Sequence, residues 1–175
     1  MVLPTTGRVG PAAARNLAVT ATSADWLAFC DHDDIWPVGR MAALLDASDG
    51  SDWVAGRLQL SVEPGYRPDD TILRADGTHV PFMVSASLIR LDLWNRVGGM
   101  DPALRGGDDT DLYLRAREAG AVVRLVEHTT LVYRLHASSL TAVERQSVAA
   151  ATLSVMRAAT RRRRAAASGQ EPSGG

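Results

Sequence analysis

The segment Trp26 to Trp36, WLAFCDHDDIW, places an apolar run directly before a group of acidic side chains. A short apolar run that ends in charge is typical of a buried strand in a parallel or mixed sheet, so we expect a strand over residues 26–30. In open α/β sheets, ligands bind at the carboxyl ends of the strands. The segment therefore predicts an α/β fold with a ligand site beside Asp31, Asp33 and Asp34.

The acidic group has two interpretations. Two carboxylates about 4 Å apart repel by roughly 1 kcal/mol in water and roughly 4 kcal/mol at an intermediate dielectric, so three packed together would be costly without a cation. Oxygen ligands suit Mg²⁺ or Mn²⁺, which would keep waters and bridge to a substrate diphosphate. The alternative is a solvated turn in which Asp33 or Asp34 caps the helix that follows Pro37. His32 is expected to be an exposed spacer.

Helices and strands are expected to alternate along the chain, which indicates the α/β class. We expect helices where apolar residues recur at helical spacing between Pro, Gly and capping residues, and strands where short apolar or alternating segments occur. The expected helices are residues 12–22, 37–49, 91–97 and 110–119, and the expected strands are residues 26–30, 52–62, 82–89, 121–126 and 130–135.

The C-terminal part is expected to be a helix and a tail. Thr141 and Glu144 have the spacing of a capping box, and the helix that they open is expected to run past Met156 into Arg161–Arg164. The expected organisation is a main α/β domain over residues 1–140, a helix over residues 141–166 and a disordered tail over residues 167–175.

Composition excludes several classes of protein. The formal net charge is −1, so the chain as a whole does not attract nucleic acid, and we expect no nucleic-acid partner. The single cysteine, Cys30, excludes an internal disulfide framework, and its place in an apolar run predicts a buried thiol. No apolar stretch is long enough to span a bilayer and no leader opens the chain, so a cytoplasmic location is expected.

Two further segments contain residue types used in catalysis. Asp108 and Asp109 join an acidic loop to a helix, where the helix dipole favours carboxylates, so capping alone would explain them. A carboxylate beside an acceptor hydroxyl would instead act as a general base. His136 follows the last expected strand, with Arg134 nearby. It is either a structural histidine or a group that completes a metal shell or contacts a leaving phosphate.

Five segments, in this order, resemble the family 2 glycosyltransferases of the GT-A fold. Each match is weak by itself, but their common order over residues 10–139 is specific. The segments are GPAAARN at 10–16 (a glycine, spacers and Ala-Arg-Asn), WLAFCDHDDIW at 26–36 (an apolar strand and a D-x-D motif), VGGMD at 97–101 (Val-Gly-Gly-Phe-Asp with Met for Phe), DDTDL at 108–112 (Glu-Asp-x-Asp-Leu) and YRLHASS at 133–139 (Tyr-Arg-x-His-x-x-Ser).

The resemblance implies a GT-A-type, Rossmann-like fold with a mixed, mostly parallel sheet flanked by helices. It implies an inverting, hexosyltransferase-type enzyme that transfers a sugar from a nucleotide-diphosphate sugar to an acceptor hydroxyl. Asp109 would be the catalytic base that takes the proton from that hydroxyl. Asp108 stands where the family often has Glu.

The resemblance also implies the residues that would hold the metal and the donor. Asp31 and Asp33 would be the D-x-D pair that binds Mn²⁺ or Mg²⁺, with Asp33 the direct ligand and Asp34 supporting it. His136 would lie near the metal or the diphosphate, and Arg15 near the nucleotide. The metal would neutralise charge on the departing nucleoside diphosphate.

A departure from the family pattern lies at the start of the chain. Family members open with a strand, a helix and a second strand that hold the nucleotide base and ribose, whereas here the Ala-Arg-Asn segment already ends at Asn16. We therefore expect a partial, N-terminally truncated GT-A domain over residues 1–140, lacking the first nucleotide-binding strands, with an exposed sheet edge and weak donor affinity. The alternative to a working transferase is a non-catalytic remnant or fragment that acts as a binding or scaffold module.

Acceptor and partners are less sharply defined. The acceptor is a glycan, a glycolipid or a metabolite, and we expect its specificity in the loop over residues 63–80. An exposed sheet edge would favour a homo-oligomer. Arg161–Arg164 is either a solvated helix end favoured by the helix dipole or a peripheral contact with the inner face of the membrane, weakened by salt.

Overall fold

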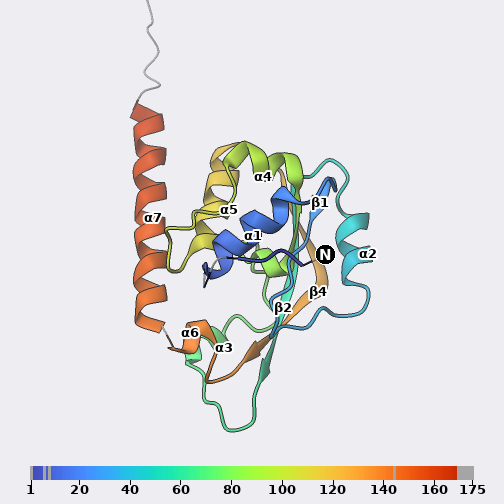
Figure 1. The fold of residues 1–175 in the computed structure, drawn as a ribbon, viewed down its shortest axis with the longest axis vertical. Helices are drawn as coiled ribbons and strands as arrows, with labels where there is room; N and C mark the ends of the chain where they lie inside the picture. Colours follow the sequence, from blue (N-terminus) through green and yellow to red (C-terminus); the bar gives the residue numbers. More distant parts are fainter. Residues whose placement is uncertain (1, 6, 8, 144, 169–175) are drawn as a thin grey trace, which may run out of the picture.

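An open four-stranded sheet with the strand order β1-β3-β2-β4 forms the centre of the computed structural model, which describes residues 2–5, 7, 9–143 and 145–168 (Figure 1). β3 pairs antiparallel with both β1 and β2, whereas β2 and β4 pair in parallel. The expected mixed sheet flanked by helices is thereby confirmed. The strands are β1 (Trp26–Leu27), β2 (Trp53–Val62), β3 (Ser87–Arg90) and β4 (Val123–Leu135).

The sheet is mostly parallel in strand direction, as expected, and β3 is the exception. β1, β2 and β4 run in the same direction, but two of the three pairings are antiparallel because β3 lies between β1 and β2 and runs against both. The chain after β2 folds back along that strand, with Arg57 bridged to His79, instead of crossing over the sheet. A parallel neighbour needs a crossover connection, so this return path makes β3 antiparallel.

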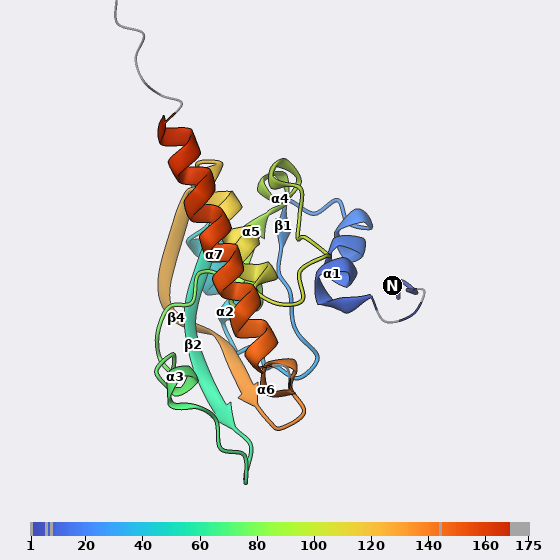
Figure 2. The same ribbon diagram turned by 90° about the vertical axis from the view of Figure 1, so that its left-hand side faces the viewer.

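Helices cover both faces of the sheet (Figures 1 and 2). β2 points Trp53 and Ala55 toward α1, α4 and α5, and Val54 toward α2. All three side chains are fully buried, as expected for a strand covered on both faces. The helices are α1 (Gly10–Thr20), α2 (Arg40–Asp46), α3 (Asp70–Leu73), the 3₁₀ helix η1 (Val84–Ala86), α4 (Leu91–Val97), α5 (Asp108–Glu118), α6 (Leu140–Val143) and α7 (Arg145–Ser168), which packs along α5.

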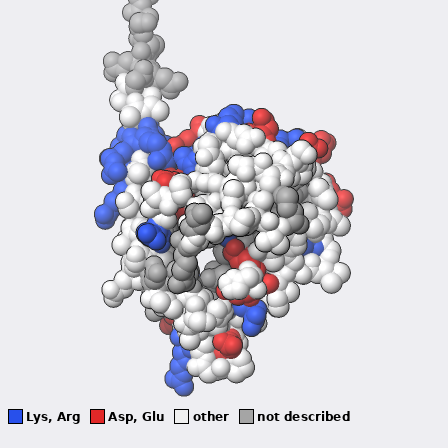
Figure 3. Space-filling model, viewed as in Figure 1, with Lys and Arg blue, Asp and Glu red and all other residues white. Residues whose placement is uncertain are grey.

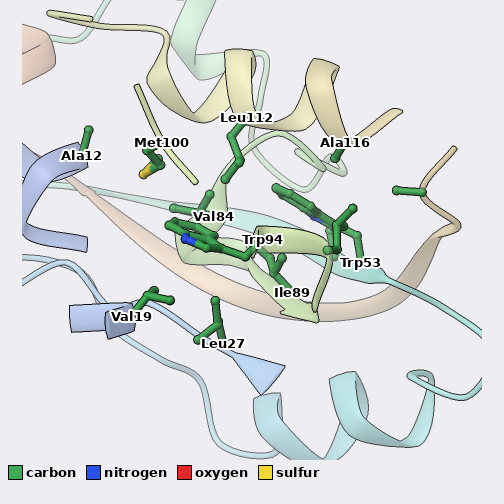
Figure 4. Packing of buried hydrophobic residues seen from close by; sticks show 13 residues of the cluster. Ala12, Val19, Leu27, Trp53, Val84, Ile89, Trp94, Met100, Leu112 and Ala116 are labelled. Atoms are coloured by element: carbon green, nitrogen blue, oxygen red, sulfur yellow. The ribbon is translucent and has the colours of Figure 1, made fainter. Parts of the chain in front are cut away.

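The larger core cluster fills the space between the sheet and α1, α4 and α5 (Figure 4). Trp53 is fully buried in it, and its Nε1 donates to Ser87 Oγ at 3.0 Å, so the indole leaves no buried donor unpaired. Asn16 joins α1 to the turn before α5, because its amide donates to the Met100 carbonyl at 2.7 Å and accepts from the Met100 N–H at 3.0 Å. This packing sets the position of α1 relative to the start of α5.

Two expected strands are shorter in the structure. The strand expected over residues 26–30 ends at Leu27, because Phe29 leaves the sheet and packs against Trp94 with ring centroids 5.3 Å apart. Cys30 therefore lies on an exposed loop, and the prediction of a buried thiol is wrong. The strand expected over residues 82–89 begins only at Ser87, since the three residues before it form η1.

β4 is one continuous strand where two were expected, over residues 121–126 and 130–135. Its register with β2 shifts on both sides of Arg57, so β4 accommodates extra residues as bulges. Gly56 permits this, because a Cβ at that position would lie 2.3 Å from Thr130 Cγ2 and 2.5 Å from the His128 carbonyl oxygen. The polar residues between the two apolar runs therefore stay in the strand.

α7 confirms the helix expected to run past Met156 and through the arginines. Glu144 of the expected capping box and residues 169–175 of the expected tail lie outside the described residues. Among the helices of the described chain, none has the length and apolar composition needed to cross a bilayer.

Candidate active site

Arg15 on α1 binds carboxylates from two other parts of the chain. Its Nη2 donates to both oxygens of Asp31, at 2.6 and 2.9 Å, and its Nη1 donates to Asp109 Oδ1 at 3.2 Å. Asp108 Oδ2 lies 4.0 Å from the same Nη1. Burial alone would lower the pKa of Arg15, but the carboxylates of Asp109, Asp31 and Asp108 raise it above its usual value. Four of the residues singled out in the sequence thus form one cluster.

Asp109 lies in the first turn of α5 with both carboxylate oxygens engaged. Oδ1 accepts from Arg15, and Oδ2 accepts the Val84 N–H at 3.0 Å. Burial raises the pKa of Asp109 to about 7, with a further increase from Asp108, although Arg15 and the Val84 N–H act in the opposite direction. The N-cap of α5 is Gly107, which has no side chain to cap the helix. Asp109 lies in the first turn of α5, where the helix dipole favours a carboxylate, and its bonds to Arg15 and the Val84 N–H add to that effect.

Asp33 and His136 form a second pair, 103 residues apart in the chain. His136 Nε2 lies 3.0 Å from Asp33 Oδ2, and His136 Nδ1 lies 2.9 Å from Ser138 Oγ. Burial would raise the pKa of Asp33, but the hydrogen bond from His136 and other contacts lower it below its usual value. His32, the neighbour, is 95% exposed, as expected for a spacer.

Asp34 attaches the acidic loop to β4. Its Oδ1 accepts the Arg134 N–H at 3.1 Å, and a backbone bridge between Ile35 and Val132 continues this contact. Its buried Oδ2 makes no hydrogen bond within the described part of the chain, and burial raises the pKa of Asp34 to about 6. The alternative interpretation, in which Asp33 or Asp34 caps the helix after Pro37, is wrong, since the N-cap of α2 is Gly39.

The side chains near Asp33 provide only some of the ligands that a divalent cation needs. Among the described residues, no three His, Cys, Asp or Glu side chains are gathered closely enough to hold a metal ion by themselves. Asp31 is already paired with Arg15, whereas Asp33 and His136 lie together with 26% and 16% of their side chains exposed. Mg²⁺-type sites often use one or two carboxylates and take their other ligands from water and substrate phosphates, which this arrangement allows.

Two contributors to the site were not identified from the sequence. The Val84 N–H holds Asp109, but a backbone donor has no residue-type signature. Arg40 is buried and donates to the carbonyls of Ser85 at 2.5 Å, of Ser87 at 3.0 Å, and of Thr130. It thereby holds the residues next to Val84. The available signal was the spacing of Arg40, which lies four residues before the buried Leu44 and so on the same face of α2, where a charged residue is unusual.

Comparisons with known proteins agree with this geometry. The family model described as Glycosyl transferase family 2 matches residues 2–71, which include Arg15 and the acidic loop. A pre-mycofactocin glycosyltransferase of Mycobacterium tuberculosis is 31% identical over 150 residues, covering 75% of this chain and 31% of the relative. The uncharacterized glycosyltransferase YwdF of Bacillus subtilis is 28% identical over 130 residues, covering 66% of this chain and 47% of the relative. The chain thus spans less than half the length of these relatives.

Solved structures share the fold at lower identity. The mannosyltransferase PcManGT from Pyrobaculum calidifontis, in complex with GDP-Man and Mn²⁺, has a TM-score of 0.55 and 19% identity, over 79% of this chain and 40% of that one. TarS 1-349 of S. aureus, in complex with UDP-GlcNAc, has a TM-score of 0.53 and 15% identity, over 75% of this chain and 40% of that one. The family-model match and the two relatives support a family 2-like glycosyltransferase, and the solved structures show that the chain shares the GT-A fold.

Proposed function

We propose that this chain carries the metal-binding and acceptor-facing part of a glycosyltransferase, which moves a sugar from a nucleotide-diphosphate sugar to an acceptor hydroxyl with inversion. The observation that carries the proposal is the environment of Asp109. Its carboxylate is held between Arg15 and the Val84 N–H, and its pKa is raised to about 7. A general base is most effective when its pKa lies near the working pH.

Asp109 would accept the proton of the acceptor hydroxyl during a single displacement. The acceptor oxygen forms a bond to the anomeric carbon while the bond from that carbon to the diphosphate oxygen breaks, and the bonding pair leaves with the diphosphate. Attack from the face opposite the leaving group inverts the configuration. The side chain of Asp109 is 23% exposed, so a hydroxyl can reach the carboxylate although two donors already orient it.

Asp33, with Asp31 and His136, would hold Mn²⁺ or Mg²⁺ in this proposal. The bound cation would neutralise charge on the leaving nucleoside diphosphate. The structural neighbour solved with GDP-Man and Mn²⁺ supports this use of the fold. Asp34 would keep the acidic loop against β4. Arg15 is occupied by carboxylates, so we propose that it serves the donor by orienting Asp31 rather than by contacting the nucleotide alone.

The donor half of the proposal is tested by calorimetry. The purified chain is titrated with UDP, GDP and dTDP, with and without Mn²⁺. Metal-dependent binding of one nucleotide is the expected result and would identify the donor class. If a chain that is folded by circular dichroism binds none of the three, the alternative of a non-catalytic binding module replaces the transferase proposal.

The base is tested by Asp109→Asn, which keeps the shape of the side chain and one of its two acceptor oxygens but cannot take a proton at neutral pH. Release of nucleoside diphosphate from the identified donor, in the presence of a panel of hydroxyl acceptors, should fall about 10²- to 10⁴-fold. Asp92→Asn is the matched control, because the Asp92 side chain is 78% exposed on α4 and, among the described residues, forms an ion pair with Arg96 alone, at 3.3 Å. Unchanged turnover in Asp109→Asn would remove Asp109 from the mechanism.

A further inference from the structure

The charge on α7 is entirely of one sign. Its 24 residues contain six arginines and no aspartate or glutamate, and four of the arginines are consecutive, Arg161 to Arg164. Figure 3 shows basic side chains gathered toward the C-terminal end of α7, where the four consecutive arginines lie. Nothing in the proposed transfer reaction uses them. Their number and position therefore need a separate explanation.

One face of α7 is committed to the rest of the protein. Val155 and Ala159 are buried, and Gly107 approaches Thr152 so closely that a Cβ on the glycine would lie 2.9 Å from the Thr152 Cα. Arg162 continues this face, since its Nε donates to Glu118 on α5 at 2.7 Å. These contacts fix which side of α7 remains turned outward.

The outward side combines apolar and basic side chains. Leu153 and Met156 are 54% and 49% exposed, and with Arg157, Arg161 and Arg164 they line a shallow groove along the helix. Their positions recur at the three- and four-residue spacing that places side chains on one helical face. α7 lies in front of the rest of the described chain in Figure 2, so no described segment covers this face.

We propose that this outer face of α7 binds the anionic surface of a membrane. Amphipathic helices of this kind lie in the membrane interface, with aliphatic side chains at the acyl boundary and arginines at the lipid phosphates. The long arginine side chains reach the headgroups while their methylene stems follow the apolar surface. Within the described residues, Glu118 pairs with Arg162 and Arg163, at 2.7 and 3.8 Å, and not with Arg157, Arg161 or Arg164, whose charges are available to the lipid.

A nucleic acid is a weaker candidate for the same surface. Phosphates of a duplex would engage the arginines but would gain nothing from Leu153 and Met156. The two exposed aliphatic side chains beside the arginines are the feature that selects a lipid surface, because burying them there removes apolar area from water.

The test is co-sedimentation of the full chain with vesicles of phosphatidylcholine alone, or of equal parts phosphatidylcholine and phosphatidylglycerol. Binding is expected only to the anionic vesicles and should weaken as salt is raised. Each arginine near such a surface contributes about 1 kcal/mol, so Arg157→Gln/Arg161→Gln should lower the binding constant about 10- to 30-fold. Leu153→Gln/Met156→Gln, which leaves the charge unchanged, should also weaken binding.

The matched control is Arg67→Gln/Arg74→Gln, which removes the same charge from exposed residues before and after α3 that are not part of the outer face of α7. It should bind vesicles like the unmodified chain. Equal binding to both vesicle types would overturn the proposal, as would an equal loss in the control. If Leu153→Gln/Met156→Gln binds vesicles normally while the chain binds duplex DNA just as tightly, the face is a general polyanion site and the lipid proposal fails.

Discussion

Arg15 and Asp109 are 94 residues apart in the chain, yet Arg15 Nη1 lies 3.2 Å from Asp109 Oδ1. The same guanidinium binds both oxygens of Asp31, so one cation connects the proposed base with the proposed metal-binding loop. Burial raises the pKa of Asp109 to about 7, and Arg15 opposes that increase. The position and the ionisation of the base therefore depend on a residue from another helix.

Arg15→Ala should move the acid limb of the pH profile of kcat/KM to higher pH. Without the guanidinium, the pKa of Asp109 rises further, so the carboxylate is ionised only in more alkaline solution. The variant should also lose about 2 to 4 kcal/mol of unfolding free energy in urea at neutral pH, because Asp31 and Asp109 lose their cation. Arg15→Lys keeps the charge without the bidentate geometry, so its acid limb and its unfolding free energy should lie between those of the wild-type chain and Arg15→Ala. An unmoved acid limb in Arg15→Ala would contradict the coupling.

Asp109→Asn should stabilise the protein more at alkaline than at acidic pH. The pKa of Asp109 is about 7 in the folded chain and about 3.9 in an unfolded one. The unfolding free energy of the wild-type chain therefore falls as the pH rises from the lower to the higher value. The amide does not titrate. Urea unfolding should therefore favour the variant by about 1 to 3 kcal/mol more at about pH 8 than at about pH 5. If the difference in unfolding free energy between Asp109→Asn and the wild-type chain does not change with pH, as expected for Asp92→Asn, the pKa of Asp109 is not raised by burial.

Asp33→Asn should remove the metal dependence of nucleotide binding. Asp33 keeps a lowered pKa beside His136, so it is an anionic ligand at neutral pH, and an amide is a much poorer ligand for a hard cation. The Kd measured with Mn²⁺ should rise at least about 10- to 100-fold, toward the value measured in a chelator. Asp92→Asn, at an exposed carboxylate on α4 that pairs with Arg96, is the control and should bind normally. Retained Mn²⁺ dependence in Asp33→Asn would place the metal elsewhere.

Arg40→Met should cost both stability and turnover. Arg40 is 1% exposed, its guanidinium lies 4.3 Å over the Trp36 ring, and it donates to three backbone carbonyls. Leaving those acceptors buried and unpaired should lower the unfolding free energy by about 3 to 5 kcal/mol. kcat should fall as well, because the segment that Arg40 holds contains the Val84 N–H that orients Asp109.

Arg90→Gln is a suitable comparison for that variant. Arg90 also lies over an indole, 4.4 Å from the Trp26 ring, but the hydrogen bonds of its guanidinium within the described chain are long ones, 3.4 Å, to the Ser51 carbonyl. Arg90→Gln should lower the unfolding free energy less than Arg40→Met does and should leave kcat unchanged. If Arg40→Met and Arg90→Gln lose the same stability and both keep full turnover, Arg40 has no specific role in orienting the base.

Much of the fold follows from local pattern. The ten-residue β2 and the helix α4, which lies at the predicted residues 91–97, have the apolar spacing of their elements within one segment. β4 was split in the prediction because its central residues are polar, and only the bulges opposite Gly56 explain how they remain in the strand. Local pattern specifies periodicity, whereas strand neighbours and register depend on segments far apart in the chain.

The sequence by itself determined the α/β class, the acidic loop after the first strand, and Asp109 and His136 as candidate residues, because these depend on residue type and spacing. Only the tertiary structure decided that Arg15 joins Asp31 to Asp109, that Asp33 meets His136, and that Cys30 is exposed. It also decided that a backbone N–H, at Val84, orients the proposed base. Ion pairs and pKa shifts arise from burial and from partners about a hundred residues away, which no local pattern encodes.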